Sequence, residues 1–347
     1  MSSHRLLACL AAVALAGPLV PLVVAGPSVA AAGSSVAVAQ GPAGASVRAA
    51  GDALAFVRNG RIFSVRANGS QLTQLTSFRT NTEPVWSPDG SRIAYVHENP
   101  DASSDVWVMD ADGTHKRKIT DVGDVVSPSW QPAGQAITFA GPPRGTWNWE
   151  TWARCHGKDC RPVLQVSATA PHGAPVAVRA EVDGEQVPVE TLNASLAWAP
   201  DGVHLTAYND DSLWSPDFAL WVFDTDGDNS APFSYIGGEC CGQGRISGAS
   251  WSPAGDMIAY DSTLCSSECQ HEMRPLVFVN EYPSRHVVPL PQVRGDSQPD
   301  FSPSGERIVV THRNRETGVR RLVLVGLDGG GRTPLVAGQS GAWRPAA

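Results

Sequence analysis

The stretch Trp86-Ser87-Pro88-Asp89-Gly90 decides the fold, because variants of it recur along the chain. The other copies are WQPAG at 130–134, WAPDG at 198–202, WSPAG at 251–255, FSPSG at 301–305 and WRPAA at 343–347. In the complete copies, an aromatic residue closes a strand, proline fixes φ in the turn, and glycine supplies a positive φ before the next strand. The spacings of 44, 68, 53, 50 and 42 residues leave room for four strands in each repeat.

The segments after these turns have the composition of strands. Residues 92–96, 257–260 and 307–310 follow the repeat glycines and are rich in β-branched and aromatic residues. A third strand recurs at 106–109, 220–223 and 322–325, and a fourth is expected at 116–120. Each repeat therefore predicts one antiparallel, four-stranded blade.

The two ends of the repeat region complete each other. Residues 51–57 match a second strand and 62–65 a third, whereas 341–345 match a first strand. Pairing them makes one more blade and removes the open edges of the sheets. We therefore predict an all-β, six-bladed β-propeller whose ring is closed by pairing of the N- and C-terminal strands.

The repeat resembles the WD40-like repeat of TolB-type propellers, which is also found in prolyl-oligopeptidase-type peptidases. The resemblance covers residues 51–347, with Phe301 in place of the turn tryptophan and Ala or Ser in place of the turn aspartate in several blades. The N-terminal domain of TolB has no counterpart in the sequence. The resemblance thus implies the propeller fold, but it does not carry over the role of TolB in the envelope.

The N-terminal segment predicts export. A short n-region, a charge-free apolar run at 6–25 and small-residue cleavage sites indicate a secretory signal peptide at 1–32, followed by a flexible Ala/Gly/Ser-rich lead-in at 33–50. An uncleaved membrane anchor is the alternative. We expect the mature chain in an extracytoplasmic space, either secreted or in the cell envelope, without a stable membrane span once the leader is removed.

Composition narrows the classes of function. Hydrophobic residues make up 42% and charged residues 17%, which excludes a disordered chain and a polytopic membrane protein. The net charge is −8, and the longest basic run is Lys116-Arg117-Lys118, so we expect no nucleic-acid partner. The hydrolase, nucleotide and zinc-protease motifs are missing, and we expect no cofactor and no metal.

Cysteine usage fits an oxidising compartment. Besides Cys9 of the leader there are six candidates for disulfides: Cys155, Cys160, Cys240, Cys241, Cys265 and Cys269. We expect Cys155 and Cys160 to pair across a hairpin between the third and fourth strands of blade 3, which starts its third strand near Trp152. The other four allow three connectivities, of which we favour two cross-links between loops.

Blade geometry places one polar ring around the mouth of the propeller. It consists of the residue seven positions after each repeat glycine, and its members are Arg58, His97, Gly141, Asn209, Ser262 and His312. Asp210 and Asp261 lie next to it in sequence. These positions suit a ligand funnel, because convergent polar groups cluster at such mouths, and they equally suit solvated loop starts.

Blades 3 to 5 carry longer loops on the same face. Trp147, Trp149 and Trp214 lie in them beside carboxylates, an arrangement suited either to stacking on a ligand or to covering a neighbouring loop. An insertion at about 167–191, between blades 3 and 4, predicts an extra hairpin with Asp183-Gly184 as its turn.

We therefore expect a monomeric, non-catalytic propeller that binds an extracellular or envelope protein or polymer through the loop face of blades 3–5. The first alternative is an enzyme, a hydrolase or lyase acting on polysaccharide, with Asp210, Asp261 or His97 as its acid or base. The second alternative is a structural scaffold at the envelope. Fold alone does not decide between them.

Overall fold

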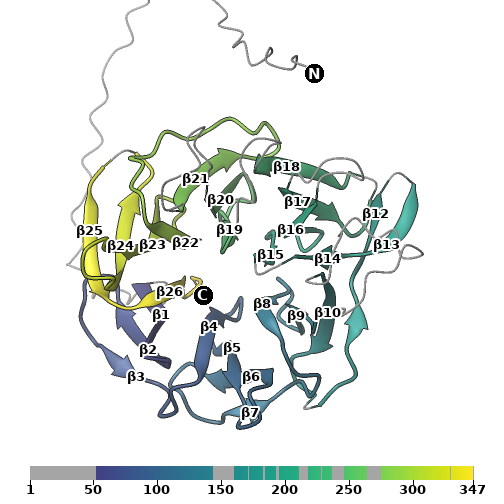
Figure 1. Ribbon diagram of the computed structural model, residues 1–347, viewed down its shortest axis with the longest axis horizontal. Coiled ribbons are helices and arrows are strands. Elements are labelled where there is room, and N and C mark those ends of the chain that lie inside the picture. Colours follow the sequence, from purple (N-terminus) through teal and green to yellow (C-terminus); the bar gives the residue numbers. More distant parts are fainter. Residues whose placement is uncertain are drawn as a thin grey trace, which may run out of the picture. The chain divides into compact units, whose positions relative to one another are not determined.

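The computed structural model describes residues 52–143, 160–170, 172–182, 184–192, 195–210, 218–227, 229–236, 246–263, 275–328 and 330–346. All of them belong to one compact unit, Arg48–Ala347. This unit is all-β and forms a ring of six sheets around a central axis (Figure 1). The predicted fold class is confirmed.

Each sheet is one blade, described here from the innermost strand outward. Blade 1 contains β26 (Gln339–Trp343), β1 (Ala53–Arg58), β2 (Arg61–Arg66) and β3 (Thr73–Gln74). Blade 2 contains β4 (Asn81–Trp86), β5 (Arg92–Glu98), β6 (Ser104–Asp110) and β7 (Arg117–Lys118). Blade 3 contains β8 (Val126–Trp130), β9 (Ala136–Ala140), β10 (Arg161–Ser167) and β11 (Val176–Ala177), with β14 (Glu190–Thr191) also paired to β10.

The remaining blades repeat the pattern. Blade 4 contains β15 (Ala197–Trp198), β16 (His204–Asp210), β17 (Phe218–Asp224) and β18 (Ala231–Ile236). Blade 5 contains β19 (Ala249–Trp251), β20 (Met257–Ser262) and β21 (Leu276–Glu281), and an isolated bridge from Asn280 to Val287 marks its fourth position. Blade 6 contains β22 (Asp296–Phe301), β23 (Arg307–Arg313), β24 (Arg320–Gly326) and β25 (Arg332–Ala337).

The ring closes as the sequence predicts. Strand β26 pairs antiparallel with β1, with Leu54 opposite Trp343 and Ala55 opposite Ala342. The last described strand is thus the inner strand of the first blade, so closure requires both ends of the repeat region. In Figure 1, yellow β26 lies beside purple β1 at this seam.

The blades are held together by apolar clusters between neighbours. One such cluster lies between blades 1 and 2 and contains Ala55, Ile62 and Tyr95, all at most 2% exposed. Comparable clusters fill the other five seams among the described residues. Burial of apolar area in these seams is the main stabilising contribution to such a ring.

Three of the repeat tryptophans also connect their blade to the backbone of the preceding one by a hydrogen bond. Trp86 Nε1 donates to the Ala342 carbonyl, Trp130 Nε1 to the Val85 carbonyl and Trp251 Nε1 to the Ala197 carbonyl, each at 3.2 Å. In every case the acceptor directly precedes the aromatic residue of the preceding blade. The repeat therefore encodes the seam as well as the turn.

The two faces of the ring differ in their connections. One face, called the top face here, carries the loops between second and third strands and the connections between blades. The opposite face carries the repeat turns and the loops between third and fourth strands. All second strands end on the top face because the strands alternate in direction.

Blade 3 departs from the sequence prediction. Its third strand is β10, in which Val163 pairs with Ala140, and not a strand near Trp152. Strand β10 takes the third position in the blade because Val163 and Val166 bury their side chains in the adjoining seams, at 0% and 3% exposure. The second strand therefore ends at Ala140 and the third begins at Arg161, and of the residues between them only 141–143 and 160 are described. Cys160 therefore lies directly before the third strand, and not in a hairpin between the third and fourth strands as predicted, whereas Cys155 lies outside the described residues.

The insertion after β10 forms the expected extra hairpin. Strand β12 (Arg179–Val182) pairs with β13 (Glu185–Pro188), and the predicted turn separates them. Ala180 and Val182 pack against Trp221 and Phe223 of blade 4. The hairpin thus fills the seam between blades 3 and 4.

Candidate functional site

The predicted polar ring lies where the second strands end on the top face. Arg58 ends β1, His97 lies near the end of β5, and His312 near the end of β23. Ser262 is the last residue of β20, and Asn209 is the residue before the last one of β16. The side chains of Asn209 and Asp210, and Trp147, Trp149 and Trp214 entirely, fall outside the described residues.

Both ring histidines are anchored by the first strand of their own blade. His97 Nδ1 lies 2.9 Å from Asn81 Oδ1, and His312 Nδ1 lies 2.8 Å from Asp296 Oδ1. Asn81 and Asp296 occupy equivalent positions, five residues before the turn aromatic. The sequence analysis missed this pairing, although the fixed spacing from Trp86 and Phe301 could have revealed it.

The surroundings of these histidines differ. His97 contacts Trp107 edge to face, with centroids 5.0 Å apart, and burial lowers its pKa more than the nearby Glu98 charge raises it. His312 shares Asp296 with Arg332, which donates to both carboxylate oxygens at 2.7 and 3.0 Å. Asp296 is 3% exposed, so His312 Nδ1 is anchored on a buried carboxylate that also pairs with Arg332.

Asp261 and Arg58 also make framework contacts. Asp261 is 1% exposed and accepts hydrogen bonds from the Ser247 backbone at 2.5 Å and the Gln298 backbone at 2.7 Å. Burial raises its pKa against the effect of these bonds. Arg58 lies over Phe56 and Phe63, 5.3 Å from each ring centroid, and donates from Nε to the Ala337 carbonyl at 2.7 Å.

A second ring, not foreseen from the sequence, lies on the innermost strands. It consists of the residue three positions before each turn aromatic, and its members are Glu83, Ser127, Ser195, Gly248, Gln298 and Ser340. The five that are not glycine have positive φ. Register shifts in the inner strands mark these positions as β-bulges in several blades.

The bulge ring links neighbouring blades through side chain to backbone bonds. The Ser127 N–H donates to Glu83 Oε2 at 2.5 Å, and the Ser195 N–H donates to Ser127 Oγ at 3.0 Å. Gly248 has no side chain to accept from the next blade, and Asp261 instead receives the Gln298 N–H. Asp261 therefore substitutes for the missing member of this ring, which gives it a structural role.

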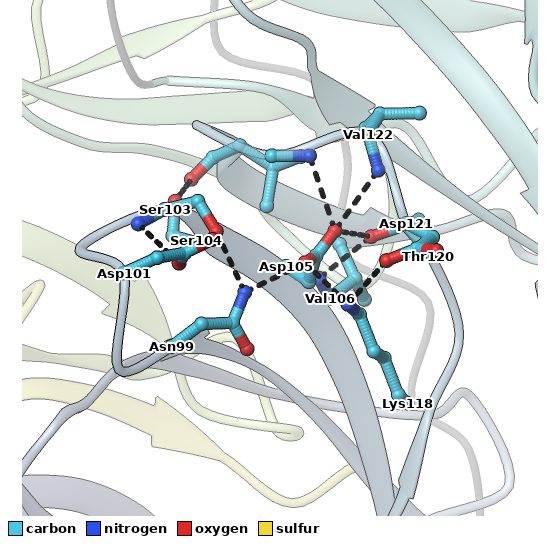
Figure 2. Close-up of polar contacts among 12 residues, drawn as sticks. Asn99, Asp101, Ser103, Ser104, Asp105, Val106, Lys118, Thr120, Asp121 and Val122 are labelled. Carbon is cyan, nitrogen blue, oxygen red and sulfur yellow. Dashed lines mark hydrogen bonds and ion pairs between the residues drawn. The ribbon is translucent and has the colours of Figure 1, made fainter.

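An acidic cluster fixes the connection between blades 2 and 3. Figure 2 shows Asp105, at the start of β6, surrounded by Asn99, Lys118, Thr120 and the backbone of Val122. Lys118 Nζ lies 2.9 Å from Oδ2, and Thr120 Oγ1 donates to Oδ1 at 2.9 Å. Burial acts to raise the pKa of Asp105, but the bonds from Lys118, Asn99 and Thr120 outweigh it, and the pKa is lowered. Asp105 is thus a charged anchor of this loop.

Of the six cysteines expected to form disulfides, Cys160 lies among the described residues. Cys160 is 4% exposed, but Cys155, Cys240, Cys241, Cys265 and Cys269 lie outside the described residues, so every proposed pairing stays a prediction. Within the described part of the chain, no group of three His, Cys, Asp or Glu side chains is placed to hold a metal ion. In the same part of the chain, no helix is long and apolar enough to cross a bilayer.

Sequence comparison with known proteins matches only short segments of the chain, whereas structural comparison matches most of it. No family model matches the chain. The uncharacterized peptidase YuxL of Bacillus subtilis is 35% identical over 60 residues, and the Tol-Pal system protein TolB of Anaeromyxobacter dehalogenans is 51% identical over 47 residues. These segments cover 17% and 13% of this chain but only 9% and 11% of the two relatives. The crystal structure of TolB from Acinetobacter baumannii superposes with a TM-score of 0.59 at 18% identity, over 85% of this chain and 67% of that one.

Proposed function

Because this chain is a TolB-like six-bladed β-propeller, we propose that it is an exported, non-catalytic binding protein whose top face holds an envelope or extracellular protein. The strand topology establishes the fold, whereas the binding role is our inference from the candidate site. An extracellular polymer as the partner is the other outcome that the experiment below distinguishes.

The observation that carries the proposal is that the described polar side chains at the mouth are hydrogen-bonded to neighbouring strands. His97, Asp261 and His312 are each engaged by a neighbouring strand, and Asp261 is fully occupied in linking blades. A general acid or base needs a proton-transferring atom within hydrogen-bond reach of a substrate. Asp261 is 1% exposed and so is out of reach of a substrate, and the Nδ1 bonds of His97 and His312 hold the loop starts rigid. Rigid loops bind with a smaller loss of conformational entropy.

The loops of blades 3 to 5 supply the specific part of this proposal. Trp147, Trp149 and Trp214 lie outside the described residues, and we place them in top-face loops because in sequence they follow the second strands β9 and β16. Tryptophan is enriched at the centres of binding sites, where a large, rigid ring contributes much contact area. We propose that these tryptophans contact the partner. We also propose that the leader at 1–32 directs export.

The test uses the mature chain, residues 40–347, immobilised and exposed to an envelope protein fraction and to an array of cell-wall polymers. The triple variant W147A/W149A/W214A should lose the captured partner. The matched control L72A/V287A removes exposed apolar side chains away from the top-face loops, at 46% and 63% exposure, and should capture normally. Capture of a polymer alone would replace the protein partner, and turnover of that polymer would establish the enzyme alternative with Asp210 as its first candidate.

A further inference from the structure

Two neighbouring top-face hairpins place arginine directly opposite arginine. In blade 1, Arg58 pairs with Arg61 across the turn between β1 and β2. In blade 6, Arg313 pairs with Arg320 at the end of the β23–β24 hairpin. Like charges directly opposite each other destabilise an antiparallel pair. Two such pairs therefore work against the stability of the fold, and binding offers a reason for keeping them.

The two hairpins lie next to each other. Arg58 Nε donates to the carbonyl of Ala337, and Ala337 is the register partner of Arg321. The N–H of Gly338 in turn donates to the carbonyl of Arg320, at 3.0 Å. The end of β25 thus bridges both hairpin tips, and the arginines of blades 1 and 6 form one surface.

The arginines of blade 1 are held in place with their outer nitrogens unused. Arg61 Nε donates to the Ser77 carbonyl at 2.8 Å, as Arg58 Nε does to Ala337. Among the described residues, neither side chain has an acidic partner, and the terminal nitrogens of both make no hydrogen bond. A guanidinium fixed through Nε presents these terminal nitrogens as a fork suited to a carboxylate.

The charge of this surface opposes that of the whole chain. Residues 58–61 and 312–321, named here the arginine surface, carry six arginines and one acidic residue, Glu316. The chain as a whole has 26 Lys and Arg against 34 Asp and Glu. Arg313, Arg320 and Arg321 are exposed and have no ion pair with any described residue. This local excess of positive charge attracts an anionic partner.

Exposed apolar side chains lie beside these charges. Val319, between the arginines of blade 6, is 49% exposed. Phe78, in the segment that follows Ser77, is 71% exposed and contacts the ring of His97 edge to face, with centroids 6.4 Å apart. Arginine together with aromatic residues is typical of protein–protein interfaces. It favours a polypeptide over a purely polar polymer.

We propose that the arginine surface of blades 1 and 6 binds a carboxylate-rich polypeptide segment that also carries apolar side chains. The carboxylates pair with the guanidinium forks, and the apolar side chains contact Phe78 and Val319. This inference rests on the proposed binding role of the top face, and it adds the chemistry of the partner and a place on blades 1 and 6.

The test measures binding of a fluorescein-labelled peptide that repeats Glu-Glu-Leu to the mature protein by fluorescence anisotropy. The matched Gln-Gln-Leu peptide should not bind at the same concentrations. The variant R313Q/R320Q should bind about a hundredfold more weakly, since it removes two charged hydrogen-bonding partners and each contributes on the order of a tenfold change. Its thermal midpoint should stay equal or rise, because the substitution removes a like-charge pair.

A matched control separates this surface from the net charge of the protein. R179Q/R285Q makes the same change in charge at exposed arginines of the β12–β13 hairpin and of the turn after β21, and it should bind as the wild type does. The proposal is overturned if the control weakens binding equally, if the glutamine peptide binds as well, if the wild type binds neither peptide, or if polygalacturonate binds in place of the peptide.

The outcome also separates this proposal from the broader one. If wild type and R313Q/R320Q capture the same envelope partner equally well, the top face still binds but the arginine surface is not the site. If the wild type captures no envelope partner, the binding role itself fails.

Discussion

Asp300 makes the stability of the propeller depend on pH in a direction opposite to that of most carboxylates. It directly precedes the turn aromatic Phe301 and lies partly buried between blades 5, 6 and 1. Its Oδ1 accepts a hydrogen bond from Ser250 Oγ at 2.7 Å, and its Oδ2 accepts the N–H of Trp343 at 2.6 Å. Burial nevertheless raises its pKa to about 6 from 3.8.

The sign follows from proton binding. Between pH 4 and 6 the folded chain holds a proton on Asp300 that the unfolded chain has lost, so folding is favoured by acid there. The stabilisation is fully present below the unfolded value of 3.8 and is lost as pH rises through about 6. Each unit corresponds to about 1.4 kcal/mol, which gives a ceiling of about 3 kcal/mol. Partial solvent contact reduces this ceiling, and we expect about 1 to 2 kcal/mol.

The variant Asp300→Asn tests this reasoning because its amide keeps the shape and cannot ionise. We expect it to be more stable than the wild type by about 1 to 2 kcal/mol at pH 8, and to lose this advantage at pH 4. Urea unfolding of both proteins across this range measures the difference. Asp105→Asn is the control of opposite sign, because the pKa of Asp105 is lowered and its stabilising effect is lost only as pH falls. An Asp300→Asn variant no more stable at pH 8 than at pH 4, relative to wild type, would refute the argument.

Two further predictions concern the framework. Trp130→Phe keeps an aromatic ring but removes the donor to the Val85 carbonyl, and should lower the free energy of unfolding by about 1 kcal/mol in urea titration; an unchanged value would show that the bond contributes nothing. Gly60→Ala should cost about 2 kcal/mol or more, because Gly60 has φ +71° and a Cβ there would overlap the Arg79 carbonyl. Gly184→Ala is its control, with φ +77° but open space around the Cβ, and should cost less; equal losses would contradict the steric reason.

The architecture could be predicted because its signal is both local and repeated. The aromatic-x-Pro-x-Gly turn identifies the residue that closes each inner strand. The strands after it show either alternating apolar and polar residues or continuous apolar runs. Pairing of β26 with β1 followed from matching 341–345 to a first strand. One repeat can be misread, but six copies constrain each other.

The errors arose where a blade departs from its neighbours. In blade 3, Trp152 matched the third-strand position by sequence distance, yet β10 pairs with β9 because Val163 and Val166 bury their side chains there. The repeat spacing cannot show that the third strand begins later in the sequence than in other blades, because the segment near Trp152 and the segment of β10 both have the composition of strands. The expected position of Cys160, in a hairpin after the third strand, failed for the same reason.

The described ring residues lie at the strand ends where the sequence predicted them, whereas their role in ligand binding stays a prediction. His97 and His312 lie at the ends of second strands as expected. Their partners Asn81 and Asp296 stand at the same spacing before the turn aromatic, a pattern that the sequence contains but that the analysis did not use. The arginine surface escaped a search for basic runs, because Arg58 and Arg313 are far apart in sequence and meet only through the closure of the ring.

Site-specific photocrosslinking tests the central claim most directly. A photoreactive phenylalanine analogue placed at Phe78, on the top face, or at Leu72, on the opposite face, reports which face touches a partner in the envelope fraction; the native side chains are 71% and 46% exposed. The account predicts a crosslinked protein from position 78, lost in the R313Q/R320Q background, and none from position 72. Crosslinks from position 72 alone, or from neither position, would contradict it.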